Sequence, residues 1–376
     1  MSYHSIVNLD PPRGRPKYRQ VYDALSHQIT GGRLGPGDRL PSEADLVRRF
    51  GASRITVGRA LRDLQAAGLI ERRAGSGTFV RRPAPAARSL AFGVLIPELG
   101  EIEVFDAIGR GLLEAPEARP HVLVWGSRSP GASTKSDHAW RLCQQYLDRR
   151  VDGVFFAPIE GVPDREAVNR RIAEALGAAG IPLVLIDRAI EPYPRRGHHD
   201  LVALDNRRAG ASVTGHLLQL GAARPAFLGT PDAASSVDAR EAGYREALRT
   251  ATPERLPRVW RADPGDHAAI ARLLERDTPD AIVCASDRTA AVLLHALRTL
   301  GRRVPQQIRL AGIDDVEYAA LLPVPLTTLR QPCREIGMAA VRAMLDRIAQ
   351  PSLPPREILL HGSLVVRESC GAVAAA

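Results

Sequence analysis

The chain has 376 residues, of which 45% are hydrophobic and 25% are charged, a composition typical of a folded protein that is too long for one ordinary domain core. No stretch approaches the roughly 20 consecutive apolar residues of a membrane helix, and the N-terminus lacks a basic head followed by an apolar run, so we expect a cytoplasmic protein. The four cysteines lie far apart without a Cys-x-x-Cys pair, which favours reduced thiols over a zinc site or a disulfide framework.

The net charge of +9 is concentrated at one end of the chain. The first 90 residues hold 16 Lys and Arg against 7 Asp and Glu, whereas the remaining 286 residues hold 35 of each sign. A segment that alone faces a polyanion has this asymmetry. The charge pattern therefore favours a nucleic-acid-binding N-terminal segment over a basic tail kept for solubility.

Two helices are predicted at the start of this basic segment. Apolar residues at three- and four-residue spacing predict a helix over residues 16–30, closed by two glycines. Ser42 then lies three residues before Asp45, which is the spacing of a capping box, and it predicts a second helix that ends at Gly51.

A third helix and a hairpin follow. Ser53 is placed to cap a helix that stops at Gly68, and this helix would present Arg54, Ile55, Thr56 and Arg59 near its first turn, where a recognition helix meets base edges and phosphates. Two short strands, Leu69–Arg72 and Thr78–Val80, are predicted around a glycine-rich tip. The pattern indicates a helix-turn-helix followed by a wing.

The spacing of these residues also resembles a known family. The strings that carry the resemblance are Gly32-x-Leu-x-Pro-Gly-x-x-Leu-Pro-Ser-Glu43, Ser53-Arg-x-Thr-Val57, Ala60-Leu61, Gly68-Leu-Ile70 and Gly75-x-Gly-Thr-Phe79. They look like the winged helix of the gluconate-repressor (GntR) family, in which Arg usually follows Thr-Val; here that position is Gly58, and an arginine comes one residue later. The DNA-binding residues that the resemblance implies are Ser42, Arg54, Thr56, Arg59 and Gly75.

The rest of the chain has the pattern of an α/β protein. Residues 81–89 contain two prolines and no apolar periodicity, which indicates a linker. Beyond it, short apolar strands alternate with helix-length segments, a pattern that predicts two parallel sheets with flanking helices, divided near residues 187–220, and ligands at the carboxyl ends of the strands. The predicted strands are Leu90–Ile96, Val122–Trp125, Gly153–Ala157, Leu183–Ile186, Leu201–Leu204, Pro225–Leu228, Ala281–Cys284 and Arg309–Ile313. The predicted helices include Asp137–Arg149, Ala167–Ala179, Asn206–Leu220, Ala239–Thr250 and Asp287–Leu300.

A second resemblance covers roughly residues 90–368. It rests on the strings Val151-Asp-Gly-Val154, Ile181-Pro-Leu-Val-Leu-Ile-Asp187, Leu204-Asp-Asn206, His216-Leu-Leu-x-Leu-Gly221, Arg240-x-x-Gly-Tyr244, Ala285-Ser-Asp287, Gly312-Ile-Asp-Asp315 and Leu326-Thr-Thr-Leu329. In this order they resemble the sugar-binding core of the lactose-repressor family, which is similar to periplasmic sugar-binding proteins. The ligand-binding residues that the resemblance implies are Asp187, Arg240, Ser286, Asp314 and Gln331.

Other roles compete for some of these residues. Asn206 and Asp287 stand where helix caps belong, and capping is our expectation for both. Asp187 is open to a second interpretation as a structural carboxylate between the lobes. The family often has Asn or Asp where Ala157 and Ser286 stand here, so part of the usual sugar-binding polar set is missing.

Catalytic functions find little support in the sequence. No Gly-x-Ser-x-Gly elbow, His-Glu-x-x-His motif or Walker loop occurs. A winged helix of this kind can precede an aminotransferase-like domain, but the chain has only two lysines, Lys17 and Lys135, and neither stands where a Schiff base is expected. His198-His-Asp200 lies in a Pro/Arg-rich loop, where adjacent side chains diverge. We therefore expect no enzyme, no metal and no cofactor.

These observations predict an architecture and a function. We expect a winged helix-turn-helix over residues 1–80, a linker over 81–89 and a two-lobed effector and dimerisation domain over 90–376. The partners expected are a palindromic double-stranded DNA operator, a small-molecule effector that is a sugar or sugar derivative, and a second copy of the chain. The alternative from another class is a plain small-molecule binding protein whose basic N-terminus is incidental.

Overall fold

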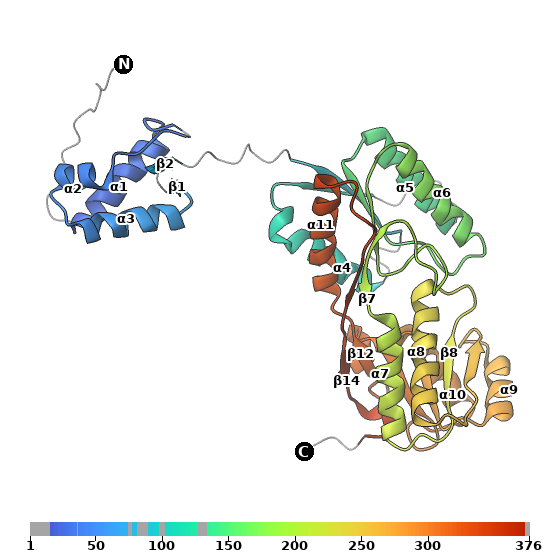
Figure 1. The fold of residues 1–376 in the computed structure, drawn as a ribbon. Coiled ribbons are helices and arrows are strands. Elements are labelled where there is room, and N and C mark those ends of the chain that lie inside the picture. Colours follow the sequence, from blue (N-terminus) through green and yellow to red (C-terminus); the bar gives the residue numbers. More distant parts are fainter. Residues whose placement is uncertain are drawn as a thin grey trace. The chain divides into compact units, whose positions relative to one another are not determined.

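The computed structural model describes residues 16–35, 37–73, 77–80, 89–97, 102–126 and 134–372. Internal contacts divide the chain into two compact units, residues 1–88 and 89–376, which are described separately below (Figure 1). Across the described ranges, every helix is too short or too polar to cross a bilayer.

In its described residues, the first unit has three helices and a two-stranded hairpin. Its elements are α1 (Lys17–Thr30), α2 (Glu43–Phe50), α3 (Arg54–Ala66), β1 (Ile70–Arg73) and β2 (Gly77–Val80). The strands pair antiparallel, with Ile70 opposite Val80. One apolar cluster holds the unit together, because Val21, Leu46 and Leu61 each come from a different helix and are almost completely buried. The winged helix-turn-helix predicted from the sequence is confirmed.

The caps of this unit follow the sequence. Ser42 accepts a hydrogen bond from the amide of Asp45, whose carboxylate accepts one in return from the Ser42 amide, so the predicted capping box at α2 is present. Ser53 caps α3 by accepting from the Thr56 amide. Gly51 ends α2 with a left-handed φ of 55°, a conformation that glycine adopts at little cost. Gly75 at the wing tip lies outside the described residues.

The second unit consists of two α/β lobes (Figure 1). The first lobe contains β3 (Ala91–Leu95), α4 (Glu103–Glu114), β4 (Val122–Trp125), α5 (Lys135–Arg149), β5 (Gly153–Phe156), α6 (Arg165–Ala178), β6 (Leu183–Ile186), β7 (Asp200–Leu204), α11 (Cys333–Ala349) and β13 (Glu357–Leu360). The second lobe contains α7 (Asn206–Gln219), β8 (Pro225–Gly229), α8 (Ser235–Ala251), β9 (Arg258–Arg261), α9 (His267–Asp277), β10 (Ala281–Cys284), α10 (Asp287–Thr299), β11 (Arg309–Asp314), β12 (Thr327–Arg330) and β14 (Ser363–Val365).

Each lobe is built on a six-stranded sheet. The strand order is β13-β7-β6-β5-β3-β4 in the first lobe and β14-β12-β11-β10-β8-β9 in the second. All described pairings in these sheets are parallel except that of β12 with β14, which is antiparallel. The predicted fold class is confirmed, with this antiparallel edge as an addition.

The core strands are buried on both faces. Phe92, Val94 and Phe155 belong to the apolar cluster on one side of the first sheet, and Leu95 and Phe156 to the cluster on the other side. Helices therefore have to cover both faces of the sheet, as in other parallel α/β architectures. The predicted apolar runs correspond to these strands within one or two residues at each end.

The chain passes between the lobes more than once. It leaves the first lobe after β7, inside the predicted division at residues 187–220, but it then returns for α11 and β13. Strand β13 pairs in parallel with β7, and α11 packs along α4 (Figure 1). More than one segment of the chain therefore connects the two lobes, and such connections are suited to hinge motion.

Candidate functional site

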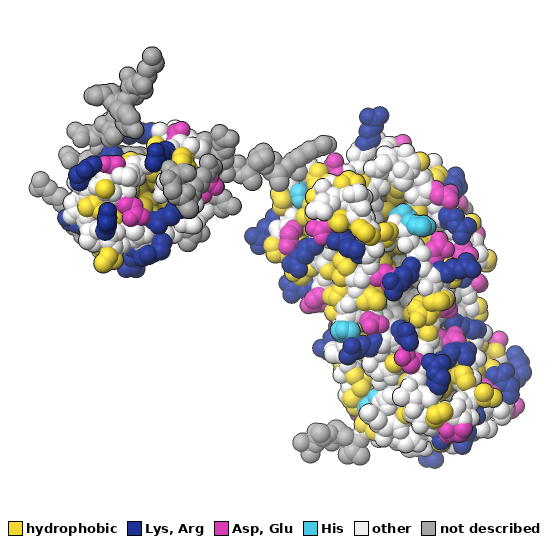
Figure 2. All heavy atoms as spheres, in the orientation of Figure 1, with side chains coloured by type: hydrophobic (Ala, Val, Ile, Leu, Met, Phe, Trp, Pro, Cys, Tyr) yellow, Lys and Arg dark blue, Asp and Glu magenta, His cyan; other side chains and the backbone are white. Residues whose placement is uncertain are grey.

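The exposed face of α3 is the first candidate site. Val57, Ala60 and Leu64 point into the core and are completely buried, whereas Arg54, Arg59 and Arg62 are exposed. Within the described part of the chain, Arg54 and Arg62 form no ion pair. Figure 2 shows more Lys and Arg than Asp and Glu side chains on the visible face of this unit. Uncompensated cations on one helix face suit a polyanion.

Local contacts hold several of the DNA-binding residues implied by the sequence. Ser42 is engaged in its capping box, and the hydroxyl of Thr56 lies 2.8 Å from that of Ser53. The Arg59 guanidinium lies over the Tyr18 ring of α1, 4.7 Å from its centroid, a cation–π distance that orients the side chain without removing it from solvent. DNA contact by these residues stays a prediction.

The second candidate site is a cleft of about 940 Å³ between the two lobes of the second unit. Its volume is at the upper end of the range for small-molecule sites. The residues predicted to bind ligand all line it: Asp187, Arg240, Ser286, Asp314 and Gln331. The structure therefore brings the five together, and their contact with a ligand stays a prediction.

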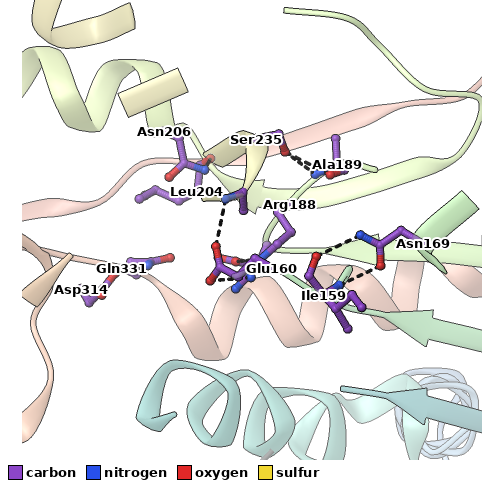
Figure 3. A network of polar contacts seen from close by, with 12 residues as sticks. Ile159, Glu160, Asn169, Arg188, Ala189, Leu204, Asn206, Ser235, Asp314 and Gln331 are labelled. Carbon is purple, nitrogen blue, oxygen red and sulfur yellow. Dashed lines mark hydrogen bonds and ion pairs between the residues drawn. The ribbon is translucent and has the colours of Figure 1, made fainter. Parts of the chain in front are cut away.

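The first lobe contributes a carboxylate–guanidinium chain to the cleft. Arg188 Nε donates to Asp187 Oδ2 at 2.8 Å, and its Nη1 lies 2.6 Å from Glu160 Oε1. The guanidinium also lies 5.1 Å from the centroid of the Phe105 ring. Burial alone would raise the pKa of Glu160, but Arg188, the Ala234 amide and Lys135 hold it below its usual value. Figure 3 shows Arg188 and Glu160 side by side.

The second lobe contributes a matching network. Arg240 Nε donates to Asn206 Oδ1 at 2.7 Å, its Nη1 donates to the Ala285 carbonyl, and that nitrogen lies 3.6 Å from Asp314 Oδ1. Gln331 Nε2 donates to the same Asp314 oxygen at 2.6 Å. Burial raises the pKa of Asp314 to about 7, although Arg240 opposes the rise.

One polar atom of this network lacks a partner. Gln331 is only 6% exposed, and its Oε1 has no hydrogen-bond partner among the described residues. A buried acceptor without a donor costs free energy of about 1–3 kcal/mol. The amide lies in the wall of the cleft, so a ligand hydroxyl is a suitable donor for it.

Backbone strain marks the same strand ends. Asp187, just after β6, has a φ of 69°, and Asp314, at the end of β11, has a φ of 141°. Residues with a side chain rarely adopt such values, and the cost of about 1–3 kcal/mol is commonly found at functional sites. One carboxylate in each lobe is thus held in an unfavourable backbone conformation beside the cleft.

Both expected caps in this region are wrong. Asp205, not Asn206, caps α7 by accepting from the Arg208 amide, which leaves the Asn206 side chain to accept from Arg240. Ser286 caps α10, and Asp287 instead accepts from the Thr328 hydroxyl and the Val316 amide. In each case the residue immediately before supplies the cap: Ser286 has an extended backbone, whereas Asp205 caps from φ −67° and ψ 82°.

Hydrogen bonds join the lobes along one rim of the cleft. Glu160 Oε2 accepts from the Ala234 amide at 3.0 Å. Ser235 Oγ donates to the Ala189 carbonyl and accepts from the Ala189 amide, both at 3.0 Å (Figure 3). Glu160 therefore contacts both the arginine in the cleft and the start of α8, the helix that carries Arg240.

Sequence reasoning missed Glu160 and Arg188. Both follow the carboxyl end of a buried first-lobe strand, as does Asp187, which the sequence analysis identified through family resemblance. Asn169 on α6 fixes the backbone beside Glu160, because its amide group donates to the Ile159 carbonyl and accepts from the Ile159 amide (Figure 3). A systematic search for charged residues after strand ends would have found the pair.

In the described ranges, no group of three or more His, Cys, Asp and Glu side chains is placed to hold a metal ion. Asp200, the last residue of the His198-His-Asp200 string, begins β7 and forms ion pairs with Arg347 and Arg356. The four cysteines are buried and form no disulfide.

A winged helix joined to a two-lobed domain with a central cleft defines a class of bacterial regulator. Residues 17–80 match the family described as "Bacterial regulatory proteins, gntR family", and residues 214–370 match "Periplasmic binding protein-like domain". The chain thus contains a GntR-type DNA-binding domain followed by a periplasmic-binding-protein-like domain.

Curated relatives and solved structures agree with this assignment. The chain is 28% identical over 367 residues to the arabinose metabolism transcriptional repressor of Geobacillus stearothermophilus, covering 94% of this chain and 97% of the relative. It is 32% identical to the regulator CelR of Thermobifida fusca over 236 residues, covering 61% and 66%. The solved structure of a CelR–cellobiose complex matches with a TM-score of 0.62 and 26% identity, covering 85% of this chain and 91% of that one.

Proposed function

We propose that the chain is a transcription repressor whose affinity for its operator is controlled by a sugar bound in the cleft. The observation that carries the sugar assignment is the polar wall of Arg240, Asp314 and Gln331, where the buried Gln331 amide oxygen has no donor in the described part of the chain. Carboxylates and an amide oxygen accept hydrogen bonds from sugar hydroxyls, and Arg donates to sugar oxygens. The cellobiose bound in the similar CelR structure supports the same ligand class.

The charges of the cleft also favour an uncharged polyol. Among the described residues, four basic side chains line it, namely Lys135, Arg188, Arg240 and Arg288, together with five acidic ones, Glu103, Glu160, Asp187, Asp263 and Asp314. Arg188 is in contact with two of the carboxylates. A site for a phosphate or another strong anion would need a surplus of uncommitted cations.

Residues 1–80 serve as the DNA-binding domain in this proposal, residues 81–89 as the linker and residues 90–376 as the effector and dimerisation domain. The linker residues 81–88 lie outside the described ranges. Arg54, Thr56 and Arg59 contact the operator from α3, and Ser42 and Gly75 are the other residues that we assign to the DNA contact. We place the protein in the cytoplasm, where its DNA is.

A homodimer on a palindromic operator completes the proposal. Leu113 on α4 and Val122 on β4 are 57% and 54% exposed, so the first lobe offers apolar surface for a second copy. Binding of the sugar closes the lobes and changes the spacing of the two winged helices. A coupling of about 1–3 kcal/mol would change operator affinity by roughly 5- to 150-fold.

Catalysis forms no part of this proposal. Lys17 Nζ donates to the Gly51 carbonyl, and Lys135 Nζ donates to the Glu160 carbonyl at 2.7 Å, so both lysines are engaged in structural contacts. The relatives named above are regulators.

A thermal-shift screen tests the ligand assignment. L-Arabinose, D-ribose, cellobiose, maltose and their acid derivatives would be added to the full chain. A sugar at 100 times its dissociation constant adds about 2.7 kcal/mol to the free energy of unfolding. Stabilisation by a neutral sugar supports the proposal, whereas stabilisation by acids alone contradicts the ligand class.

Deletion of residues 1–82 separates the two activities. We expect the shortened chain to keep its ligand-induced stabilisation and to lose operator binding. Unchanged DNA affinity in the shortened chain would contradict the division of roles.

A further inference from the structure

Ile55 occupies an unusual position in the first unit. Its side chain is 82% exposed, and it is the one large hydrophobic side chain exposed among the residues described between 16 and 80. A single exposed apolar residue is common on protein surfaces. Its neighbours in the sequence, Arg54 and Thr56, are however two of the residues expected to meet DNA, and this location gives the exposure a functional meaning.

The geometry of α3 directs Ile55 away from the core. At 100° per residue, positions three, four and seven further along the helix share its face. Those positions are Gly58, Arg59 and Arg62, whereas the buried residues Val57, Ala60, Leu61 and Leu64 form the opposite face. Ile55 therefore lies at the N-terminal end of a basic stripe.

Gly58 keeps the surface beside Ile55 low. A Cβ built at this glycine would have no heavy atom within 4 Å apart from its chain neighbours and the nearby backbone of its own helix, so the space beside it is open. The Ile55 side chain projects beside Gly58, which leaves room for another group to approach it. The two residues together make a small apolar surface bordered by cations.

DNA offers one apolar group that fits such a surface. In the major groove, where a recognition helix lies, thymine alone among the four bases presents a methyl group, and the other exposed base atoms are hydrogen-bond donors or acceptors. An isoleucine side chain can satisfy neither a phosphate nor a polar base edge. The basic residues around it supply the phosphate attraction that brings the groove to this face.

We propose that Ile55 is a specificity-determining residue that contacts the 5-methyl group of a thymine in each half-site of the operator. This inference rests on the proposed DNA-binding function and adds one base preference to it. Burial of a single methyl group makes the expected effect about fourfold in operator affinity for each half-site.

The test removes only the methyl group. A duplex operator is first selected from a randomised DNA library with the full chain at fixed salt, and each thymine is then replaced by deoxyuridine, one at a time. Fluorescence anisotropy gives the dissociation constants. For the wild-type chain we expect one thymine per half-site whose replacement weakens binding about fourfold. For Ile55→Ala, the thymine and deoxyuridine operators should bind equally.

Leu256→Ala provides a matched control, because Leu256 is 84% exposed but lies in the second unit. This variant should keep the wild-type sensitivity to the methyl group. Since Ile55 contributes little to the core, thermal unfolding should be unchanged in both variants. A wild-type chain that is indifferent to every replacement, or an Ile55→Ala variant that keeps the sensitivity, would overturn the proposal. A library that yields no selected sequence would instead contradict DNA recognition itself.

Discussion

The exposed face of α3 and the walls of the interlobe cleft use arginine in opposite ways. On α3, Arg54 and Arg62 are exposed and have no ion-pair partner in the described structure. In the cleft, Arg188 and Arg240 are 6% and 5% exposed and both contact carboxylates. A face that attracts a polyanion needs uncompensated charge, whereas a buried site for a neutral ligand needs charges that are already balanced.

The largest effect that this comparison predicts is at Arg240. Replacing it with Ala removes its hydrogen bonds to Asn206 and Ala285 and leaves Asp314 buried without its basic partner. We expect the free energy of unfolding of the second unit to fall by about 3 kcal/mol, measured by urea denaturation.

Arg245→Ala is the control for that measurement. Arg245 lies on the same helix, but its side chain is 46% exposed where it pairs with Glu241, and exposed ion pairs contribute at most about 1 kcal/mol. Equal destabilisation by the two variants would contradict the distinction between buried and exposed arginines.

Arg54→Ala should weaken DNA binding without lowering stability, which is the reverse of the effect expected for Arg240→Ala. Its side chain is exposed and has no ion-pair partner among the described residues, so unfolding should be unaffected, while operator binding should weaken by about 1–3 kcal/mol if Arg54 contacts a base. Titration of the selected operator and of random DNA at one salt concentration distinguishes the possibilities. An equal loss on both DNAs would show a phosphate contact, and no loss on either would remove Arg54 from the interface. Arg272→Ala, an exposed change on α9, serves as the control.

Glu160→Gln tests whether the charge of this cleft carboxylate helps to hold the two lobes together. The amide oxygen can still accept from the Ala234 amide, but the charge beside Arg188 is lost. We expect a decrease of about 1 kcal/mol in the stability of the second unit and faster hydrogen exchange in residues 232–236. Glu174→Gln, at an exposed position of α6, should change neither quantity. Unaltered exchange in Glu160→Gln would mean that this carboxylate does not hold the lobes together.

A further prediction concerns pH. Burial raises the pKa of Asp314 to about 7 in the folded chain, above the value of about 3.9 in an unfolded chain. The stability contributed by the protonated form is complete below about pH 4 and is lost as the pH rises through 7. The wild-type chain should therefore lose more stability between pH 5 and pH 8 than Asp314→Asn does. Parallel pH profiles would show that Asp314 does not titrate in this window.

The sequence predicted the local elements well and their long-range pairing poorly. The strands Val122–Trp125, Leu183–Ile186 and Ala281–Cys284 were predicted with their observed bounds, because buried parallel strands are short continuous apolar runs. Strand β13 was missed, since its burial alternates and its partner β7 lies some 150 residues earlier in the chain. No local pattern reveals such a pairing.

The candidate site shows the same division. Asp187, Arg240 and Asp314 were identified by family resemblance, and they converge on one cleft because strand ends of parallel sheets lie together. The caps at Asn206 and Asp287 were assigned one residue too late, because two adjacent polar residues at a helix start compete for the cap and only the backbone conformation decides. The contact between Glu160 and Ala234 depends on how the lobes meet, which the sequence does not encode locally.

Operator binding by the full chain, measured with and without neutral sugars at fixed salt, tests the central claim most directly. The proposed function predicts that at least one sugar that stabilises the chain also changes its operator affinity by roughly 5- to 150-fold. A sugar that binds the cleft and leaves the DNA affinity unaltered would contradict the coupling between the two units.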